Sequence, residues 1–587
     1  MKNKNDAPKT GKAEKVSTES TVKPLQKPRR SKAPEFKPFW LADPAKSEDS
    51  KAAKKDHSTP TTPATRKPAP RSDQAADAEQ DGHKHPSSQR ADGKYPARPD
   101  HSKGPRQDFA ARPVKGAPDQ RATGRPERPG RDERAPALRS GEVLELKISA
   151  TNDEGFGVSM HEGTRVLVAG GIPGETLVAR ITYVGRREAF ANTIKCLKVS
   201  PDRHPSPACG LGRVCDGCGL MQMRYPAQLA WKKGSVIRQV RKYPSLSEVM
   251  VHDTIGSPKE LNYRNTAKLV VSGKNSNPVI GIYRRNTHDV LEITDCSLHH
   301  PLINKVVKAA KAGIKKGKVQ IYNPKSEMGL LRYLVVRVAE PSEKVMVVLV
   351  TTEEGYNEMH HLAKFIQQAV PEVHVVAQNI NNSSGNVIFG YKDRAITKAQ
   401  TLKAWVGNKG FNLSPHSFFQ VNSGGARIIY EKVRELANLT GKERVIDVYC
   451  GIGGISLFLA DKAREVVGIE FVEAAVADAT ANAALNKADN CHFEAGDAAH
   501  LIDEIGEEGG ADLIVLNPPR KGCDERVLKS VAGIKPARII YVSCSPETLA
   551  RDLDILSRLG YRALEVTPVD MFPQTIHVEN VALLEKI

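Results

Sequence analysis

The stretch YVSCSPETLARD places a cysteine where an apolar run ends and a helical pattern begins. The apolar residues stop at Ser543, and Pro546 suits the first turn of the helix that follows. A helix amino terminus stabilises a thiolate, the reactive form of cysteine. This position predicts that Cys544 is a nucleophile. Most lone cysteines are inert small hydrophobic residues, which is our interpretation of Cys196, Cys450, Cys491 and Cys523.

A glycine-rich turn follows an apolar run in DVYCGIGGISLFLA, residues 447–460. Gly451 and Gly453 let the backbone approach a ligand closely, and the start of the next helix supplies free N–H donors. Taken alone, a purely structural tight turn explains this pattern equally well. The next apolar run, VVGIE, ends at Glu470, where a carboxylate can bind both hydroxyls of a ribose. The two runs together predict a nucleotide site.

Two further polar residues follow apolar runs of the same kind. Asp497 ends EAGD and is a candidate partner for an adenine amine. Asn517 begins NPPRKG, whose two prolines fix an extended loop. A loop stopper explains Pro-Pro but not the polar residue before it. The GIGG turn lacks the third glycine of the dinucleotide fingerprint, so the pattern fits S-adenosylmethionine (SAM) better than a dinucleotide.

A second group of cysteines lies in PACGLGRVCDGCG, where Cys209, Cys215 and Cys218 have the spacing C-x5-C-x2-C. The glycines between them let a loop wrap around an ion or cluster, and a fourth ligand must come from elsewhere. Four thiolates suit either zinc or a 4Fe-4S cluster, and the spacing alone leaves both open. Nine cysteines in a chain without a secretory signal favour thiols or metal ligands over disulfides.

The elements that must position these residues alternate regularly over residues 401–587. Short apolar runs, which we expect to be strands, are separated by helical patterns; the strands are RVIDVYC, EVVGIE, CHFEAGD, ADLIVLN and ARIIYVS. This rhythm predicts a mostly parallel, doubly wound α/β sheet of Rossmann-like type. Ligands bind such sheets beyond the carboxyl ends of the strands, which is where the candidate residues fall.

Two smaller folded regions precede this domain. Residues 141–200 show short alternating apolar runs between Gly, Asn-Asp and Pro-Gly turns, which predicts a small all-β barrel. Residues 201–400 mix strand-like runs such as KVMVVLVTT with a helical pattern at NEMHHLAKFIQQAV, which predicts an α+β domain that carries the cysteines.

Residues 1–140 have a different composition. They carry 32 Lys and Arg against 19 Asp and Glu, and 19 of the 38 prolines of the chain. We expect a disordered basic arm, which serves either as a solvated tail or as a non-specific tether to nucleic acid. The sequence shows no secretory signal and no apolar stretch long enough to span a membrane. It therefore predicts a cytoplasmic protein with no membrane association and no evident obligate protein partner.

Several motifs in order resemble the RNA uracil-5-methyltransferase family over residues 141–587. They are SFFQVN, DVYCGIGG, LNPPRKG, SCSPETLARD and MFPQTIHVE. The resemblance implies methyl transfer from SAM to carbon-5 of a uridine, with a cysteine bonded transiently to carbon-6. It makes Cys544 the nucleophile and Glu579 the base that removes the carbon-5 hydrogen. It also implies that SAM is contacted by Gln420, Tyr449, Glu470 and Asn517.

The sequence departs from the family pattern at two places. Asn517 stands where the family often has Asp, and the nucleophile motif is Cys-Ser-Pro where Cys-Asn-Pro is common. The first change puts one SAM or substrate contact in question. The resemblance assigns Cys296, in ITDCSLHH, as the fourth cysteine ligand and favours a 4Fe-4S cluster with a structural or RNA-contacting role.

Residues 141–200 resemble the TRAM domain, an RNA-binding barrel. Within the family, this domain together with the cysteine site implies 23S ribosomal RNA (rRNA), modified before or during subunit assembly, as the substrate. The alternatives are the same chemistry on transfer RNA (tRNA), or a non-catalytic RNA-binding or assembly factor. Basic residues that could line an RNA groove are Arg264, Lys268, Arg284, Arg285, Arg332 and Arg337.

Overall fold

The computed structural model describes residues 138–587, except 213, 216, 285–286 and 386. The predicted basic arm, residues 1–140, therefore lies almost entirely outside the described residues.

The first folded unit is a six-stranded sheet in the order β1-β5-β6-β4-β3-β2. Its strands alternate buried and exposed residues, and the inward side chains form a separate apolar core. β1 and β2 are the two ends of the sheet order. The strands are β1 (Val143–Lys147), β2 (Ala150–Thr151), β3 (Gly157–His161), β4 (Thr164–Ala169), β5 (Thr176–Val184) and β6 (Glu188–Lys198).

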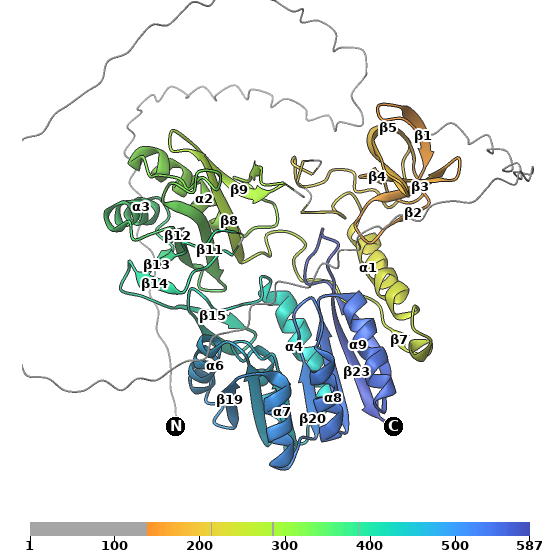
Figure 1. Cartoon of the computed structure of the whole chain (residues 1–587), viewed down its shortest axis with the longest axis vertical. Helices are drawn as coiled ribbons and strands as arrows, with labels where there is room; N and C mark the ends of the chain where they lie inside the picture. The colour runs from red at the N-terminus through yellow and green to blue at the C-terminus, as the bar shows by residue number, and fades with distance from the viewer. Residues whose placement is uncertain (1–137, 213, 216, 285–286, 386) are drawn as a thin grey trace, which may run out of the picture. The chain divides into compact units, whose positions relative to one another are not determined.

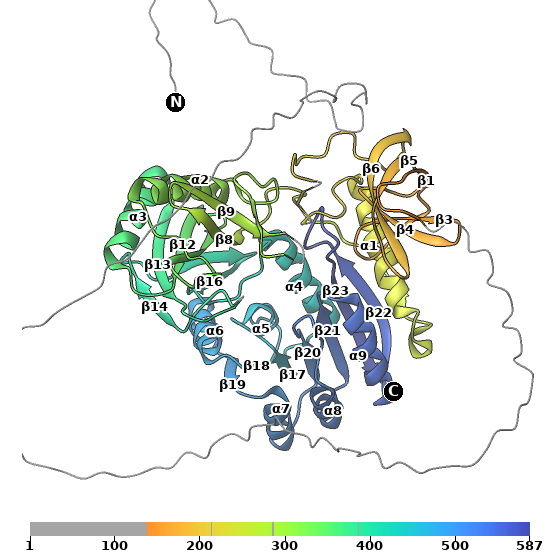
Figure 2. The same cartoon turned by 45° about the horizontal axis from the view of Figure 1, so that its top comes forward.

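A second sheet has the order β10-β9-β8-β11-β12-β13-β14 (Figure 2). Only β12 and β13 pair in parallel, because α3 connects them, and α2 and α3 cover one face. The elements are β8 (Thr266–Lys274), β9 (Asn277–Tyr283), β10 (Val290–Glu292), α2 (Pro301–Gly317), β11 (Leu331–Ala339), β12 (Lys344–Thr351), α3 (Tyr356–Ala369), β13 (Val373–Ile380) and β14 (Lys392–Ala395).

The third sheet has the order β19-β18-β17-β20-β21-β23-β22-β7 (Figure 1 for β7, Figure 2 for the other strands). The five strands from β19 to β21 are parallel, whereas β23 is antiparallel to both β21 and β22. The strands are β17 (Arg444–Val448), β18 (Glu465–Glu470), β19 (Cys491–Ala495), β20 (Leu513–Leu516), β21 (Arg538–Ser543), β22 (Tyr561–Val569), β23 (Glu579–Lys586) and β7 (Met250–Val251). The strand order reverses between β17 and β20, so a crevice opens at their carboxyl ends.

Helices cover both faces of this sheet. Side chains of β21 alternate between two apolar clusters: Ile540 and Val542 contribute to one, Ile539 and Tyr541 to the other. The first cluster includes α4 (Ser423–Ala437), α5 (Gly454–Ala460), α6 (Glu473–Asn486) and the hairpin of β15 (Leu402–Val406) and β16 (Lys409–Leu413). The second includes α1 (Tyr225–Val240), the short η2 (Pro244–Leu246), α7 (Ala498–Glu507), α8 (Glu525–Ile534) and α9 (Pro546–Arg558).

The doubly wound sheet is thus the one that the sequence predicts. One detail differs from the expectation: β7 joins this sheet although it lies within the 201–400 range. β7 reaches the sheet because α1, which precedes it, packs against α9 and β22. No helix of the described residues is both long enough and apolar enough to cross a membrane.

Candidate active site

A cleft lies at the carboxyl end of β17. Four of the predicted cofactor residues line it: Gln420, Tyr449, Gly451 and Asn517. The other residues that line the cleft are Phe411, Phe418, Phe419, Tyr430, Asp447, Cys450, Ile452, Gly454 and Ile455. The predicted SFFQVN, DVYCGIGG and LNPPRKG motifs therefore meet at one place although they are far apart in the chain.

The glycine-rich turn is shaped by left-handed backbone conformations. Tyr449 has φ 64°, Gly451 has φ 56° and Gly453 has φ 83°. A Cβ at Gly453 would lie 3.1 Å from the ring of Phe493, so this glycine is needed for packing as well as for conformation. Gly453 is the residue before α5 and does not line the cleft.

Glu470, at the end of β18, holds this turn in place. Its carboxylate accepts hydrogen bonds from the backbone N–H groups of Gly451, at 3.1 Å, and Val472, also at 3.1 Å. Asp497 instead caps α7, where it accepts a hydrogen bond from the N–H of His500 at 3.2 Å, and lies 3.8 Å from Arg526. The structure therefore places Glu470 next to the turn and Asp497 outside the lining of the cleft.

Asp447 is a buried carboxyl group at the base of the cleft. One oxygen accepts a hydrogen bond from Ser456 Oγ at 2.6 Å, and the other is buried without a hydrogen-bond partner among the described residues. Burial raises the pKa of Asp447 to about 7. A carboxyl group with an open acceptor beside a cleft fits a ligand with an ammonium group, such as the amino-acid end of SAM. Sequence reasoning missed Asp447, although it begins the quoted glycine motif.

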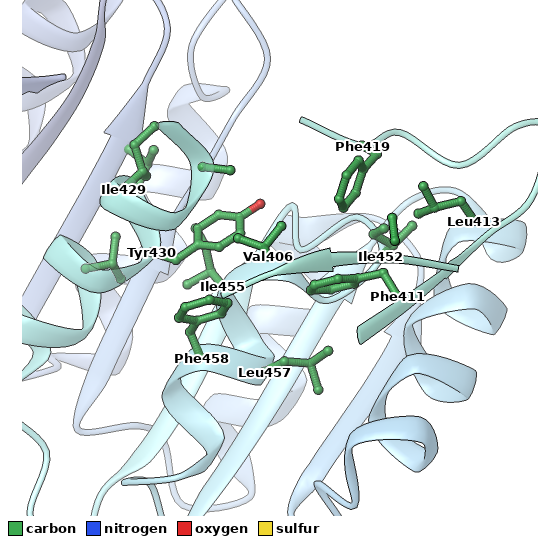
Figure 3. Packing of buried hydrophobic residues seen from close by; sticks show 14 of the residues in the cluster. Val406, Phe411, Leu413, Phe419, Ile429, Tyr430, Ile452, Ile455, Leu457 and Phe458 are labelled. Atoms are coloured by element: carbon green, nitrogen blue, oxygen red, sulfur yellow. The ribbon is translucent and has the colours of Figure 1, made fainter. Parts of the chain in front are cut away.

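Aromatic side chains line part of the cleft, and Figure 3 shows Phe411, Phe419 and Tyr430 within the apolar cluster beside it. The rings of Phe411 and Phe419 lie 5.8 Å apart, and those of Tyr430 and Phe458 lie 5.1 Å apart. Phe418 lines the same cleft but is 66% exposed. An exposed aromatic ring at a cleft is suited to stacking on a planar ligand. The paired aromatics of SFFQVN were the signal for Phe418, which sequence reasoning passed over in favour of Gln420.

Cys544 and Glu579 come together at the ends of two neighbouring strands. β21 pairs with β23 so that Ser543 is opposite Asn580. Cys544 follows Ser543 and Glu579 precedes Asn580, so these two residues come next at the same end of the pair. Ser545 caps α9 by accepting a hydrogen bond from the N–H of Thr548 at 3.4 Å, so the thiol lies next to the start of this helix. The predicted nucleophile and the predicted base are therefore neighbours.

Both groups have raised pKa values. Burial raises the pKa of Glu579 to about 7. Burial and the nearby charge of Glu579 raise the pKa of the Cys544 thiol. The helix start was expected to stabilise a thiolate, and a hydrogen bond from the backbone N–H of Cys544 does lower the thiol pKa, but desolvation of this half-buried thiol has the larger effect.

Arg520 is the charged residue that faces both groups. Its guanidinium lowers the pKa of Cys544 by charge and hydrogen bonding, and it lowers the pKa of Glu579 by charge, against the larger effect of burial. Arg520 follows the two prolines of LNPPRKG, which position the loop. Of the residues in this motif, only Asn517 was predicted to belong to the site. A basic residue directly after a rigid Pro-Pro turn was the signal for Arg520.

A buried polar network fixes the loop that carries Arg520. Asp552 of α9 accepts hydrogen bonds from Tyr541 OH at 2.5 Å and from the N–H of Cys523 at 2.8 Å. Arg551 donates to the carbonyls of Lys521 at 3.0 Å and Cys523 at 3.3 Å. The helix that begins beside Cys544 thus also holds the loop that ends in Cys523.

The four predicted metal ligands lie near one another. Cys209, Cys218 and Cys296 pack against the same small apolar cluster, and Cys209, Cys215 and Cys296 all contribute to the raised pKa of Cys218, after its burial. Four neighbouring thiols are a donor set that suits iron–sulfur or zinc. Yet no group of three or more His, Cys, Asp or Glu side chains within the described ranges has the arrangement of a metal site.

The prediction that Arg332 and Arg337 could contact RNA is wrong. Arg332 and Arg337 are each only 4% exposed. Arg332 donates to the carbonyls of Asn381 and Ser383, both at 2.7 Å. Arg337 donates to those of Ser414, at 3.0 Å, and Ser417, at 2.8 Å. Both guanidinium groups therefore tie backbone segments together and cannot contact RNA.

Comparisons with known proteins identify the family of this chain. Residues 224–587 match the profile of a family described as tRNA (uracil-5-)-methyltransferase. A Geobacter sulfurreducens protein described as an uncharacterized RNA methyltransferase is 58% identical over 452 residues, which are 77% of this chain and 91% of that protein. A relative from Caldanaerobacter subterraneus with the same description is 39% identical over 77% of this chain and 99% of its own.

A solved structure is similar over most of the described residues. The crystal structure of Pyrococcus abyssi tRNA (uracil-54, C5)-methyltransferase with S-adenosyl-L-homocysteine has a TM-score of 0.62 and 29% sequence identity. The similarity covers 75% of this chain and 100% of that one. The chain belongs to the tRNA (uracil-5-)-methyltransferase family and is a SAM-dependent RNA methyltransferase.

Proposed function

We propose that this protein methylates carbon-5 of a uridine in 23S rRNA through a covalent bond between Cys544 and carbon-6 of the uracil. The observation that carries the proposal is the pairing of β21 with β23, which puts a thiol and a carboxylate side by side at the crevice edge. Methyl transfer alone needs neither group, whereas a covalent route needs both.

Each step uses residues of this site. The target base leaves its stack to reach the crevice, where the exposed ring of Phe418 can support it. The Cys544 thiolate adds to carbon-6, and the electron pair of the carbon–carbon double bond moves into the ring as an enolate that is nucleophilic at carbon-5. Arg520 favours the thiolate by its positive charge. SAM, when bound, supplies the methyl group that carbon-5 accepts.

The last step restores the uracil ring. Glu579, as a carboxylate, removes the hydrogen from carbon-5, the carbon–carbon double bond forms again, and the carbon–sulfur bond breaks. The thiolate of Cys544 leaves and is ready for another turn. The cofactor would be held by Gln420, Tyr449, Gly451 and Asn517 in the lining of the cleft, with Glu470 bracing the turn and Gly453 shaping it. Asp497 remains a candidate for the adenine amine.

The choice of 23S rRNA depends on the all-β unit and on the cysteine site, which the family resemblance associates with that substrate. A tRNA substrate is the second candidate, because the similar solved structure is that of a tRNA enzyme. Methylation of separately prepared 23S rRNA and tRNA transcripts, followed by mass mapping of the modified nucleotide, separates the two. We expect 5-methyluridine in the rRNA alone; 5-methyluridine in tRNA alone would overturn the rRNA assignment, and its absence from both would favour a non-catalytic factor.

We further propose that Cys209, Cys215, Cys218 and Cys296 hold a 4Fe-4S cluster. Their mutual proximity and their thiol chemistry support this. No step of the methylation needs redox chemistry, so the cluster would stabilise the cysteine loop or contact RNA. Iron and sulfide analysis of anaerobically purified protein should give about four of each per chain. One zinc per chain would contradict the assignment.

A further inference from the structure

The loop of residues 570–577, between β22 and β23, leads directly to Glu579 and is held in an unusual way. Four consecutive carbonyl oxygens, from Met571 to Gln574, each accept a hydrogen bond from a residue far away in the chain. The donors are Asn422 Nδ2, Lys232 Nζ, Tyr263 OH and the N–H of Leu220, each at 3.0 Å. All four donor residues are buried.

Helix α1 supplies two residues that hold this loop. Lys232 and Gln228 lie one turn apart on it, on the same face. Lys232 forms an ion pair with Asp570 at 2.5 Å, and both side chains are fully buried. Gln228 and Gln574 exchange two hydrogen bonds of 2.9 Å, one from the side chain of Gln228 and one from the N–H of Gln574.

The second pair acts on a strained position. Gln574 has φ 72°, a left-handed conformation that costs free energy for a residue other than glycine. The two hydrogen bonds with Gln228 hold Gln574 in this conformation. A fully buried ion pair is often no more stabilising than apolar residues of the same size, so stability alone accounts poorly for Lys232 and Asp570. A role in placing the loop accurately accounts for both the buried ion pair and the strained conformation of Gln574.

We propose that Lys232 and Gln228 are positioning residues that act through the 570–577 loop on Glu579, and that they control the release of the methylated product. The inference rests on the proposed function, because Glu579 is the base only in a covalent mechanism. In this elimination step, Glu579 takes the proton from carbon-5, and the electron pair of the carbon–hydrogen bond forms the carbon–carbon double bond. The electron pair of the carbon–sulfur bond returns to Cys544. Addition of Cys544 and methyl transfer precede this step and do not use Glu579 as a base.

The test separates the two halves of the reaction. Lys232→Met and Asp570→Asn each remove one partner of the ion pair, and Gln228→Met is a milder change that removes the amide pair. In a single turnover on uridine RNA, formation of S-adenosylhomocysteine should stay within about threefold of wild type. Decay of the covalent protein–RNA adduct should slow by about a hundredfold, the effect of a base displaced by roughly 1 Å. The methylated adduct should therefore accumulate.

Arg203→Met is the matched control. It removes one partner of another buried ion pair, which joins Arg203 to Glu175, the residue before β5. This variant should lose stability without accumulating adduct. Equal slowing of both half-reactions in the Lys232 and Gln228 variants, or no accumulation, would overturn the inference alone. If wild-type protein forms no adduct with 5-fluorouridine RNA, the proposed function and the inference fall together.

Discussion

Cys544 and Glu579 are neighbours because an antiparallel pair of strands, β21 and β23, fixes their register at Ser543 and Asn580. Glu579 is also the first residue of β23, where it is opposite Val569 of β22. The backbone of Glu579 is therefore fixed by the sheet at the end of β23. Strand register sets its place beside the thiol, and the 570–577 loop that leads to it is itself held by Lys232 and Gln228.

The first prediction is a pH profile. Glu579 has a pKa of about 7, and the pKa of Cys544 is raised above its usual value. Both groups act as anions in the proposed mechanism, so protonation at low pH should inhibit both addition and elimination. The methylation rate at saturating RNA and SAM, measured from pH 5.5 to 9, should rise through pH 7 and continue to rise. A rate that falls over this range would contradict the assigned roles.

The second prediction concerns stability. Between pH 4.5 and about 7 folded Glu579 binds a proton that the unfolded chain has lost, so the free energy of unfolding falls as the pH rises across this window. The ionised carboxylate thus costs about 3 kcal/mol above pH 7. Glu579→Gln should stabilise the protein in urea unfolding at pH 8 and not at pH 4. Glu585→Gln, an exposed residue of the same strand, should show no such difference.

The third prediction concerns Arg520. Replacing it by methionine removes the charge that lowers the pKa of Cys544. The rate at pH 7.5 should fall by about tenfold, equivalent to one pKa unit, and the rate should recover partly at pH 9. Lys521→Met changes the adjacent exposed residue and should leave the profile unchanged. A rate loss that is independent of pH would mean that Arg520 acts by another route.

The fourth prediction concerns the glycine turn. Glu470→Ala removes the acceptor for the N–H groups of Gly451 and Val472, so the turn loses its brace. The Kd for SAM, measured by calorimetry without RNA, should rise about tenfold or more, because hydrogen bonds to a charged group contribute roughly 1.5–3 kcal/mol. Glu473→Ala, an exposed position in the first turn of α6, is the control. Unchanged SAM affinity in the Glu470 variant would remove this residue from the cofactor site.

Much of the catalytic sheet was predictable, because nearly continuous apolar strands alternate with helical patterns from β17 to β21. The positions of the glycine turn and of Glu470 were predictable for the same reason, because residues that follow parallel strands lie together at one edge of the sheet. Cys544 was predicted as the nucleophile from its position between a strand and a helix. Glu579 was predicted as the base from the family resemblance alone, since its own surroundings in the sequence look like those of a surface residue.

The remainder depends on contacts between distant segments. Burial of Cys544 and the charge of Glu579 raise the thiol pKa, and neither could be read from the helix start that follows Cys544. Arg332 and Arg337 look like surface charges in the sequence, but carbonyl groups from other segments enclose them. The links from Lys232 and Gln228 to residues 570 and 574 span more than 330 residues, and no local pattern predicts them.

The most direct test of the covalent mechanism is trapping with RNA that contains 5-fluorouridine at the target site. Fluorine cannot leave as a proton, so the adduct persists once the methyl group is transferred. Wild-type protein with SAM should give a stable protein–RNA complex whose mass includes one methyl group, with the bond mapped to Cys544. Cys544→Ala should bind the RNA and give no complex, whereas Cys491→Ala should behave as wild type. Active wild-type protein that yields no adduct, or an adduct that persists in Cys544→Ala, would contradict the account.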